Sequence, residues 1–241
     1  MGSKRAVRYL SQADTRALLA WPEVIACLRA AYAGSDDPRA APPKVVARKD
    51  GMWLRALTAI SGSGAFMGAK IIAKGRPKGA DHFTALWDTQ SGELVCLMAA
   101  KSVTGVRTAG TSAVAIDLIA RKAPLRLAIL GSGHEASTHV SALAAVRKVG
   151  ALAVYSPTPA NRERFAARMT GELGIACRAA GSAREAVEGA DIVIAAARSH
   201  DETPILEGAW LKAGIPAWSQ NSRHLANCCF RSAGGGSRLA L

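Results

Sequence analysis

Residues 127–137, LAILGSGHEAS, contain two glycines and an alanine at a spacing that suits the pyrophosphate of a dinucleotide. In such a G-x-G-x-x-A loop, Gly131 permits the tight turn and Gly133 lets the backbone approach the pyrophosphate. The small Ala136 allows close packing of the next helix, whose amino end offers N–H groups to phosphate. An ordinary strand-to-helix turn is the alternative, but a strand before the loop and a helix after it favour the phosphate site. The expected cofactor contacts are Gly131, Ser132, Gly133, His134, Glu135 and Ala136.

The end of the next expected strand bears on which nicotinamide cofactor is used. NAD-binding proteins usually carry a carboxylate there, whereas this chain reads VYSPTPANRER, with Ser156 at the acidic position. Without the carboxylate a 2′-phosphate is not repelled, and Arg162 or Arg164 can hold it. We therefore expect NADP(H), with NAD(H) as the alternative, and name Ser156 and Arg162 as cofactor contacts. The competing interpretation is that both arginines are ordinary exposed helix residues.

Two patterns of hydrophobic residues divide the chain. From Leu125 onward, strand-like runs (RLAIL, LAVYS, IACRA and ADIVIAAA) alternate with helical segments, which predicts βαβ units and a parallel sheet. Residues 11–33 have the spacing of a helix, with Pro22 suited to a first turn. Five short runs between residues 44 and 100 follow, separated by turn signals, and predict a mostly antiparallel β region. A helix rich in small residues, SVTGVRTAGTSAVAIDLIA, lies between the two regions.

The expected fold class is α/β, with a Rossmann-type parallel sheet domain preceded by a smaller mixed α+β domain. We expect the first domain over residues 1–110, the NAD(P)-binding domain over 111–214 and an atypical tail over 215–241. The tail has no acidic residue and no clear hydrophobic period. A doubly wound sheet should nevertheless need one or two strands from it.

Composition excludes several classes of protein. The net charge is +13, but the basic residues are dispersed and aromatic residues make up only 5%. These features favour a basic surface or a site for anionic cofactors and carboxylates over nucleic-acid binding. No apolar run reaches the length of a membrane span, so we expect no membrane partner and a cytoplasmic protein. The five scattered cysteines have no CxxC or His spacing, and we expect no metal.

Five stretches together resemble the ornithine cyclodeaminase/mu-crystallin family, which includes archaeal-type alanine dehydrogenases and imine reductases. They read PPKVVARKDGMWLRAL, MGAKIIAKGRP, TGVRTAGTSAVA, AILGSGHEAS and ADIVIAAA. The resemblance implies an NAD(P)-dependent oxidoreductase for a small amino acid or its keto or cyclic-imine partner. It also implies a homodimer in which the first domain binds the substrate and dimerises.

By the same resemblance, five side chains belong to the substrate site. Lys44 and Arg55 match basic substrate contacts, Lys70 a lysine at the substrate carbonyl or carboxylate, Thr84 a substrate-side or nicotinamide-side contact, and Arg107 the arginine that grips the α-carboxylate. Lys70 and Arg107 are the catalytic candidates. A planar guanidinium binds a carboxylate bidentately, and a lysine near other cations can exchange protons with an amine or imine. For Lys44 and Arg55, a solvated surface charge is the alternative.

Two departures from the family pattern shape the expected activity. Glu135 stands where the family usually has glutamine, and a carboxylate near pyrophosphate is unfavourable unless it points away. The catalytic aspartate of the cyclodeaminases has no counterpart in IPAWSQNSRHLAN, which offers Asn221, Ser222 and Arg223. A reductase or dehydrogenase is therefore favoured over a cyclodeaminase. The alternatives are a non-catalytic protein that binds the cofactor and a carboxylate ligand, and an inactive truncated or frameshifted relative.

Overall fold

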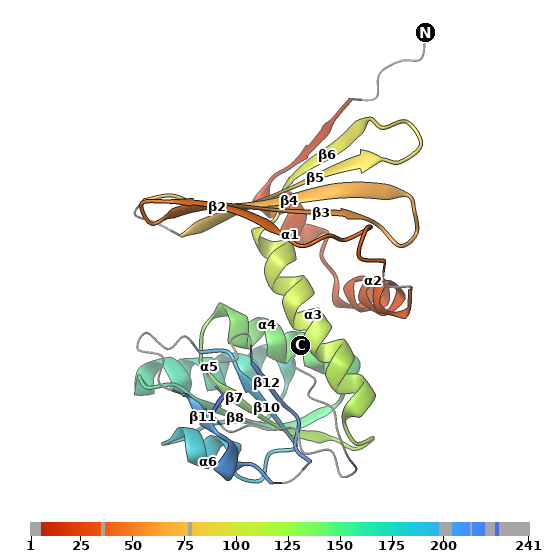
Figure 1. Cartoon of the computed structure of the whole chain (residues 1–241). Helices are drawn as coiled ribbons and strands as arrows, with labels where there is room; N and C mark the ends of the chain where they lie inside the picture. The colour runs from red at the N-terminus through yellow and green to blue at the C-terminus, as the bar shows by residue number, and fades with distance from the viewer. Residues whose placement is uncertain are drawn as a thin grey trace. The chain divides into compact units, whose positions relative to one another are not determined.

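A computed structural model describes residues 6–34, 37–76, 79–197, 204–212 and 214–219, and the backbone of 225–226. The chain divides into two compact units, residues Met1–Thr108 and Ala109–Leu241 (Figure 1). Helix α3 (Lys101–Ile119) contributes its first part to one unit and its last part to the other. No helix in the described part of the chain is long and apolar enough to cross a bilayer.

The first unit is built on a six-stranded sheet. Its strands are β1 (Arg8–Leu10), β2 (Val45–Lys49), β3 (Met52–Ile60), β4 (Phe66–Lys74), β5 (Ala80–Asp88) and β6 (Leu94–Ala99). The order is β1-β6-β5-β4-β3-β2, antiparallel except that β1 pairs parallel with β6. The predicted antiparallel β region is confirmed. The edge strand β1 was missed, because three residues are too few to establish a period.

The helix expected over residues 11–33 is wrong as a single element. It consists of α1 (Gln12–Ala17), capped by Ser11 and Asp14 in a capping box, and α2 (Trp21–Ala33), which has Pro22 in its first turn. A helix continuing through Pro22 would lack the backbone N–H that bonds four residues back. The break therefore falls just before the proline, where its missing donor has no cost.

The second unit is the expected Rossmann-type parallel sheet. Its strands are β7 (Leu125–Leu130), β8 (Val149–Tyr155), β9 (Cys177–Ala179), β10 (Ile192–Ala195) and β12 (Ala217–Ser219), in the order β12-β10-β7-β8-β9. All four pairings are parallel. Numbered within this unit, the order is 3-2-1-4-5 read from β9, the doubly wound arrangement. The carboxyl end of β7 lies at its switch point, where such sheets bind ligands.

Helices and a short second sheet complete this unit. The helices are α4 (His134–Val146), α5 (Pro159–Leu173), α6 (Ala183–Val187) and the 3₁₀ turn η1 (Gly208–Trp210), and β11 (Leu206–Glu207) pairs with β13 (Leu225–Ala226). The strands are apolar on both faces, and their side chains form two clusters of buried residues, one on each face. An ion pair of 2.6 Å between Arg147 and Asp117 ties the end of α4 to α3.

The expected tail contributes directly to the sheet. Strand β12 comes from Ala217–Ser219, beyond the expected limit of 214, and pairs with β10. Trp218 packs against the core from this strand. The sheet thus obtains its fifth strand from a segment whose composition gave no sign of a strand. Two or three residues suffice for a strand when they lie beside an existing edge strand.

Candidate functional site

The turn after β7 can be made only by glycine. Gly131 has a φ of +118°, a region that side-chain-bearing residues rarely adopt. A Cβ at this position would lie 2.8 Å from the backbone nitrogen of Ala197 and 2.9 Å from the backbone carbon of Ala196. Its own N–H donates to the carbonyl of Tyr155 at 2.7 Å. The loop is therefore held tightly against the ends of two neighbouring strands.

The amino end of α4 is open where a phosphate would approach. Gly133 is the N-cap of the helix, and no side chain caps its first turn. A Cβ at Gly133 would meet nothing within 4 Å, so the backbone faces open space. Ala136 is fully buried, which lets the helix pack closely on the sheet. Helix N–H groups that no side chain caps, beside an accessible backbone, fit a pyrophosphate.

Ser156 and Arg162 form a second part of this site at the end of β8. The Ser132 hydroxyl donates to Oγ of Ser156 at 2.9 Å, which joins the glycine loop to the next strand. Nη1 of Arg162 donates to the Ser156 carbonyl at 3.0 Å. The Arg162 guanidinium also lies over the ring of Tyr155, 5.7 Å from its centroid. Arg164, by contrast, is an exposed residue of α5, so of the two arginines Arg162 is the one held at the strand end.

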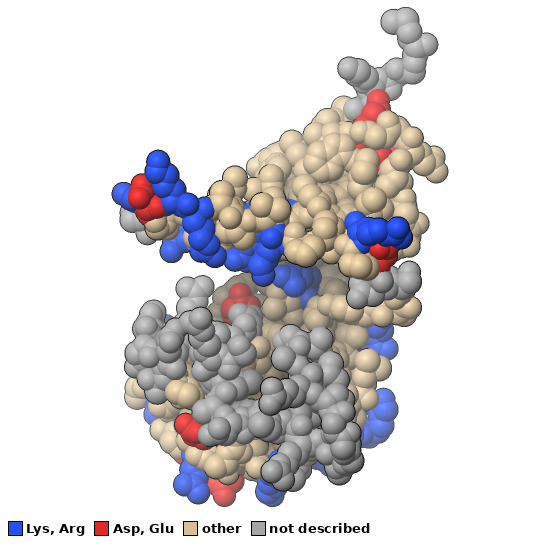
Figure 2. All heavy atoms as spheres, in the orientation of Figure 1, with Lys and Arg blue, Asp and Glu red and all other residues tan. Residues whose placement is uncertain are grey.

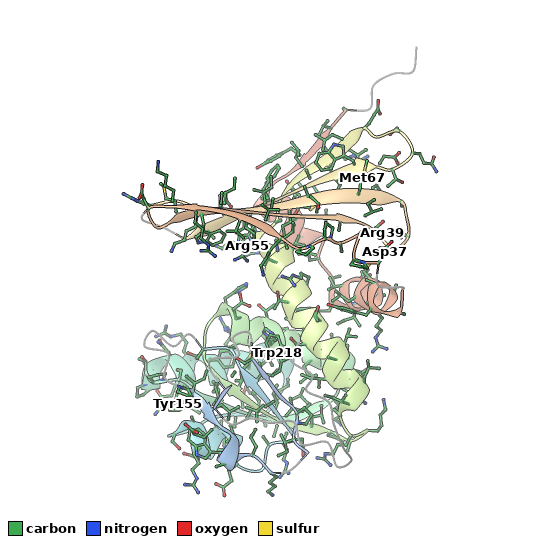
Figure 3. All side chains as sticks on the ribbon, viewed as in Figure 1. Asp37, Arg39, Arg55, Met67, Tyr155 and Trp218 are labelled. Carbon is green, nitrogen blue, oxygen red and sulfur yellow. The ribbon has the colours of Figure 1, made fainter. Side chains whose placement is uncertain are left out.

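His139 is a buried residue of this unit that the sequence analysis missed. Its Nδ1 hydrogen-bonds the carbonyl of Glu135 at 2.7 Å, and its ring centroid lies 4.6 Å from that of Trp218. Trp218 is labelled in Figure 3. Burial lowers the pKa of His139, so the ring is neutral near pH 7. Glu135 itself is half-buried in the first turn of α4, where the helix dipole favours a negative charge.

In the first unit, the sheet register brings three of the expected substrate residues to one face. Lys70 of β4 is paired directly with Thr84 of β5, and on its other side with Leu57 of β3. Arg55 lies two residues from Leu57 on the same strand, and therefore on the same face and diagonal to Lys70. Met67 lies on the opposite face, as Figure 3 shows for Arg55 and Met67.

The pKa of Lys70 on this face is strongly perturbed by its surroundings. Burial, and then the positive charges of Arg107 and Arg55, lower the pKa of Lys70 to about 8. Arg55 lies over the ring of Trp53 at 5.0 Å, and its Nε is buried without a hydrogen-bond partner among the described residues. Arg107 comes from α3 and is exposed. Figure 2 shows Lys and Arg side chains gathered along one side of this unit. The three cations Arg55, Lys70 and Arg107 together are suited to binding a carboxylate.

Comparisons with known proteins identify the family of this chain. The model of the ornithine cyclodeaminase/mu-crystallin family matches residues 10–218. The chain belongs to this family. Ketimine reductase mu-crystallin of Mus musculus is 33% identical over 129 residues, which cover 54% of this chain and 39% of the relative. The NAD(P)H-dependent anabolic L-arginine dehydrogenase of Pseudomonas aeruginosa is 34% identical over 112 residues, covering 46% and 35%.

A solved structure extends the likeness over both units. The Δ1-pyrroline-2-carboxylate reductase of Thermococcus litoralis, in complex with NADH and L-proline, aligns with a TM-score of 0.77 and 26% identity. The alignment covers 88% of this chain and 68% of that one. The segments matched in the two curated relatives span less than two-fifths of those proteins' length.

Not every residue that the family resemblance implied joins the group around Lys70. Lys44 is exposed and directly precedes β2, the edge strand of the sheet, so its role in this family member stays a prediction. Asn221, Ser222 and Arg223, at the position of the cyclodeaminase aspartate, lie outside the described residues. Among the described residues, no three His, Cys, Asp or Glu side chains gather as metal ligands would.

His82 is the second residue of this chain that the sequence reasoning missed, after His139. It lies on β5 two residues before Thr84, and hence on the same face of the sheet as Lys70. Its Nδ1 is 2.8 Å from Oγ1 of Thr104 in α3. The signal was available in the sequence, because strict alternation along ADHFTALWD places His82 and Thr84 on one face.

Proposed function

We propose that this chain is an NAD(P)-dependent oxidoreductase acting on a small α-amino acid or on its keto or cyclic-imine partner. The observation that carries the proposal is Lys70, half-buried on the sheet face that also carries Arg55 and Thr84, where burial and the charges of Arg107 and Arg55 lower its pKa to about 8. A carboxylate is the ligand that such a group attracts, and the amine poised near neutrality suits proton exchange with an amine or imine. The named activities of relatives in the same family support this choice of substrate class.

Each residue has a distinct role in the proposal. Arg107 grips the substrate α-carboxylate with its planar guanidinium, and Arg55, on the same sheet face as Lys70, adds a second positive charge that attracts this anion. Lys70 holds or accepts the proton at the substrate nitrogen or carbonyl oxygen, and Thr84 lines the face beside it. The nicotinamide, when bound, supplies or takes the hydride at the α-carbon. Lys44 serves as an outer basic contact for the substrate.

The cofactor in this proposal is NADP(H), with NAD(H) as the alternative. The backbone of Gly131, Ser132 and Gly133 and the amino end of α4 hold the pyrophosphate, with His134, Glu135 and Ala136 in the first turn of that helix. Ser156 leaves no carboxylate to repel a 2′-phosphate, and Arg162 offers its remaining donors to it. One family relative is named as NAD(P)H-dependent, and another was solved with NADH.

The proposed protein is a cytoplasmic homodimer whose first unit forms the interface. The sheet face opposite Lys70 carries exposed apolar side chains, among them Val45 at 73%, Leu54 at 50% and Ile71 at 37% exposure. An apolar patch of this kind marks an association surface. Leu54→Glu is expected to convert a dimer into monomers in analytical ultracentrifugation, and a wild-type monomer would contradict this part of the proposal.

The decisive experiment is titration of the full chain with NADPH and NADH, followed by nucleotide fluorescence. We expect saturable binding of at least one, tighter for NADPH, and no binding of either at millimolar concentration would overturn the proposal. A turnover screen with cyclic imines, keto acids plus ammonia, and amino acids then tests catalysis. Binding without any turnover would instead identify a non-catalytic protein that binds the cofactor and a carboxylate.

A further inference from the structure

The imidazole of His82 has a defined tautomer. Oγ1 of Thr104 donates its single proton to the carbonyl of Ala100 at 2.8 Å, one helical turn back. The same oxygen lies 2.8 Å from Nδ1 of His82, so it can only accept there, and Nδ1 carries the proton. Nε2 is then a bare acceptor in the neutral ring. The two ring nitrogens point in divergent directions, so Nε2 is turned away from Thr104.

The ring is held on both sides by regular structure. His82 is paired with Ile72 of β4, and its carbonyl accepts from the N–H of Ala100 at 2.8 Å, just before α3 begins. Lys70 lies two residues from Ile72, and so diagonal to His82 on the shared face. Arg55 is diagonal to Lys70 on the other side. Lys70 thus has a cationic neighbour on β3 and an imidazole on β5.

The surroundings keep this imidazole neutral. Burial lowers the pKa of His82, and the charges of Lys70, Lys101 and Arg107 lower it further, while Asp81 acts in the opposite sense. Asp81 precedes His82 on the strand, so it points to the other face. The two rows across the sheet, Arg55–Ile72–His82 and Leu57–Lys70–Thr84–Met98, contain no carboxylate. Among these side chains, Nε2 of His82 is an acceptor with no hydrogen-bond partner in the described part of the chain.

We infer that Nε2 of His82 accepts a hydrogen bond from the substrate nitrogen, either the N–H of an amine or that of an iminium. The inference rests on the proposed function, in which the same face binds the substrate carboxylate. Three cations select a carboxylate but offer nothing to an N–H donor, since ammonium and guanidinium groups only donate when charged. His82 supplies an acceptor that the three cations lack, so the imidazole and the cations together distinguish an α-amino or α-imino acid from a plain carboxylic acid. Thr104 is a positioning residue that sets the tautomer.

The test compares two planar probes that differ at one ring atom. Pyrrole-2-carboxylate presents an N–H beside its carboxylate, whereas furan-2-carboxylate presents an oxygen in the same place. In calorimetric titrations of the full chain at pH 7.5, we expect wild type to bind pyrrole-2-carboxylate about five- to tenfold more tightly than furan-2-carboxylate. This is the affinity ratio expected from one additional hydrogen bond. His82→Leu removes the acceptor and should abolish that preference while leaving furan-2-carboxylate affinity within twofold. His82→Gln, which restores an acceptor, should recover part of it.

A matched pair of threonine substitutions tests the positioning role. Thr104→Val removes the hydroxyl that fixes Nδ1–H, and should reduce the pyrrole preference. Thr108→Val, one turn further along α3, removes a hydroxyl that bonds the carbonyl of Thr104 at 2.7 Å, and should leave the preference intact. Imidazole ¹⁵N NMR, with His82→Gln used to assign the signal among five histidines, should show the Nδ1–H tautomer in wild type and a mixture in Thr104→Val.

The possible outcomes are distinguishable. Equal affinities of wild type for the two probes, or a preference that survives His82→Leu, would overturn the inference and leave the carboxylate site standing. Binding of neither probe would overturn the carboxylate site and this inference together. Because both probes are titrated without nucleotide, failure to bind both NADPH and NADH would overturn the proposed oxidoreductase function but would not alter the interpretation of His82.

Discussion

The guanidinium of Arg162 donates a hydrogen bond to the backbone carbonyl of Ser156, with 3.0 Å between Nη1 and the oxygen. This bond fixes the arginine at the end of β8 with donors remaining for an anion. Arg162→Ala should therefore weaken NADPH binding about 30-fold, corresponding to about 2 kcal/mol for a charged hydrogen bond. NADH binding should change less than about twofold. Fluorescence titration of both nucleotides measures the two effects.

Arg164→Ala is the matched control, since Arg164 is an exposed residue of the same helix. Its affinity for NADPH should equal that of wild type. Equal losses in the two variants would indicate a general effect of positive charge on α5 rather than a 2′-phosphate contact at Arg162.

The two glycines of the loop should fail in different ways. Gly131→Ala forces a side chain into a positive φ and against backbone 2.8 Å away, and we expect it to lower the free energy of unfolding by at least about 2 kcal/mol. Gly133→Ala meets no atom within 4 Å and should leave the melting temperature within about 1 °C. The same methyl group occupies the approach of the pyrophosphate and should weaken nucleotide binding at least about tenfold. Thermal unfolding and nucleotide titration separate stability from binding, and a melting temperature lowered equally in both variants would contradict the assigned roles.

The carboxylate of Glu135 should limit cofactor affinity. It lies in the first turn of α4, where it competes with the pyrophosphate for the positive end of the helix dipole. Glu135→Gln should tighten binding of NADPH and NADH alike, by about fivefold at low salt and less at high salt, as about 1 kcal/mol of screened repulsion is removed. Glu172→Gln, an exposed change in α5, serves as control and should have no effect. Unchanged or weaker binding in Glu135→Gln would mean that this carboxylate points away from the phosphate.

Carboxylate binding should weaken as the pH rises through about 8. The pKa of Lys70 in the free protein is lowered to about 8, so the ammonium charge is present below that pH and lost above it. An anion binds the protonated form better, and the affinity for furan-2-carboxylate should therefore fall between pH 7.5 and 9.5. Lys70→Met should bind more weakly at pH 7 and show a flat profile over this range. A wild-type profile equally flat would exclude Lys70 from the site.

The same substitution should stabilise the fold. Lys70 is charged at pH 7 although burial and two arginines disfavour that charge, so removing it relieves repulsion. We expect Lys70→Met to raise the melting temperature by roughly 2–4 °C, the effect of about 1 kcal/mol in a chain of this size. A variant that is less stable than wild type would show that the lysine stem contributes more by packing than its charge costs.

Local signals in the sequence were sufficient for most of the architecture. Period-two runs indicated β2 to β6, alternating strands and helices indicated the parallel sheet, and Gly131 with Gly133 indicated the turn after β7. These features arise from steric and hydrophobic preferences of neighbouring residues, which a single sequence exposes directly. The family resemblance was likewise carried by short contiguous stretches.

Tertiary pairing decided the remainder. Strands β1 and β12 are each three residues long and exist because an established strand edge offers them hydrogen bonds. The union of Arg55, Lys70 and Arg107 and the bond between His82 and Thr104 likewise depend on register and on helix placement. Residue type and spacing determined which chemistry the chain could perform. Which side chains share a dielectric environment and a common face, and therefore which of them act together, was decided only when the sheet and α3 brought distant residues into contact.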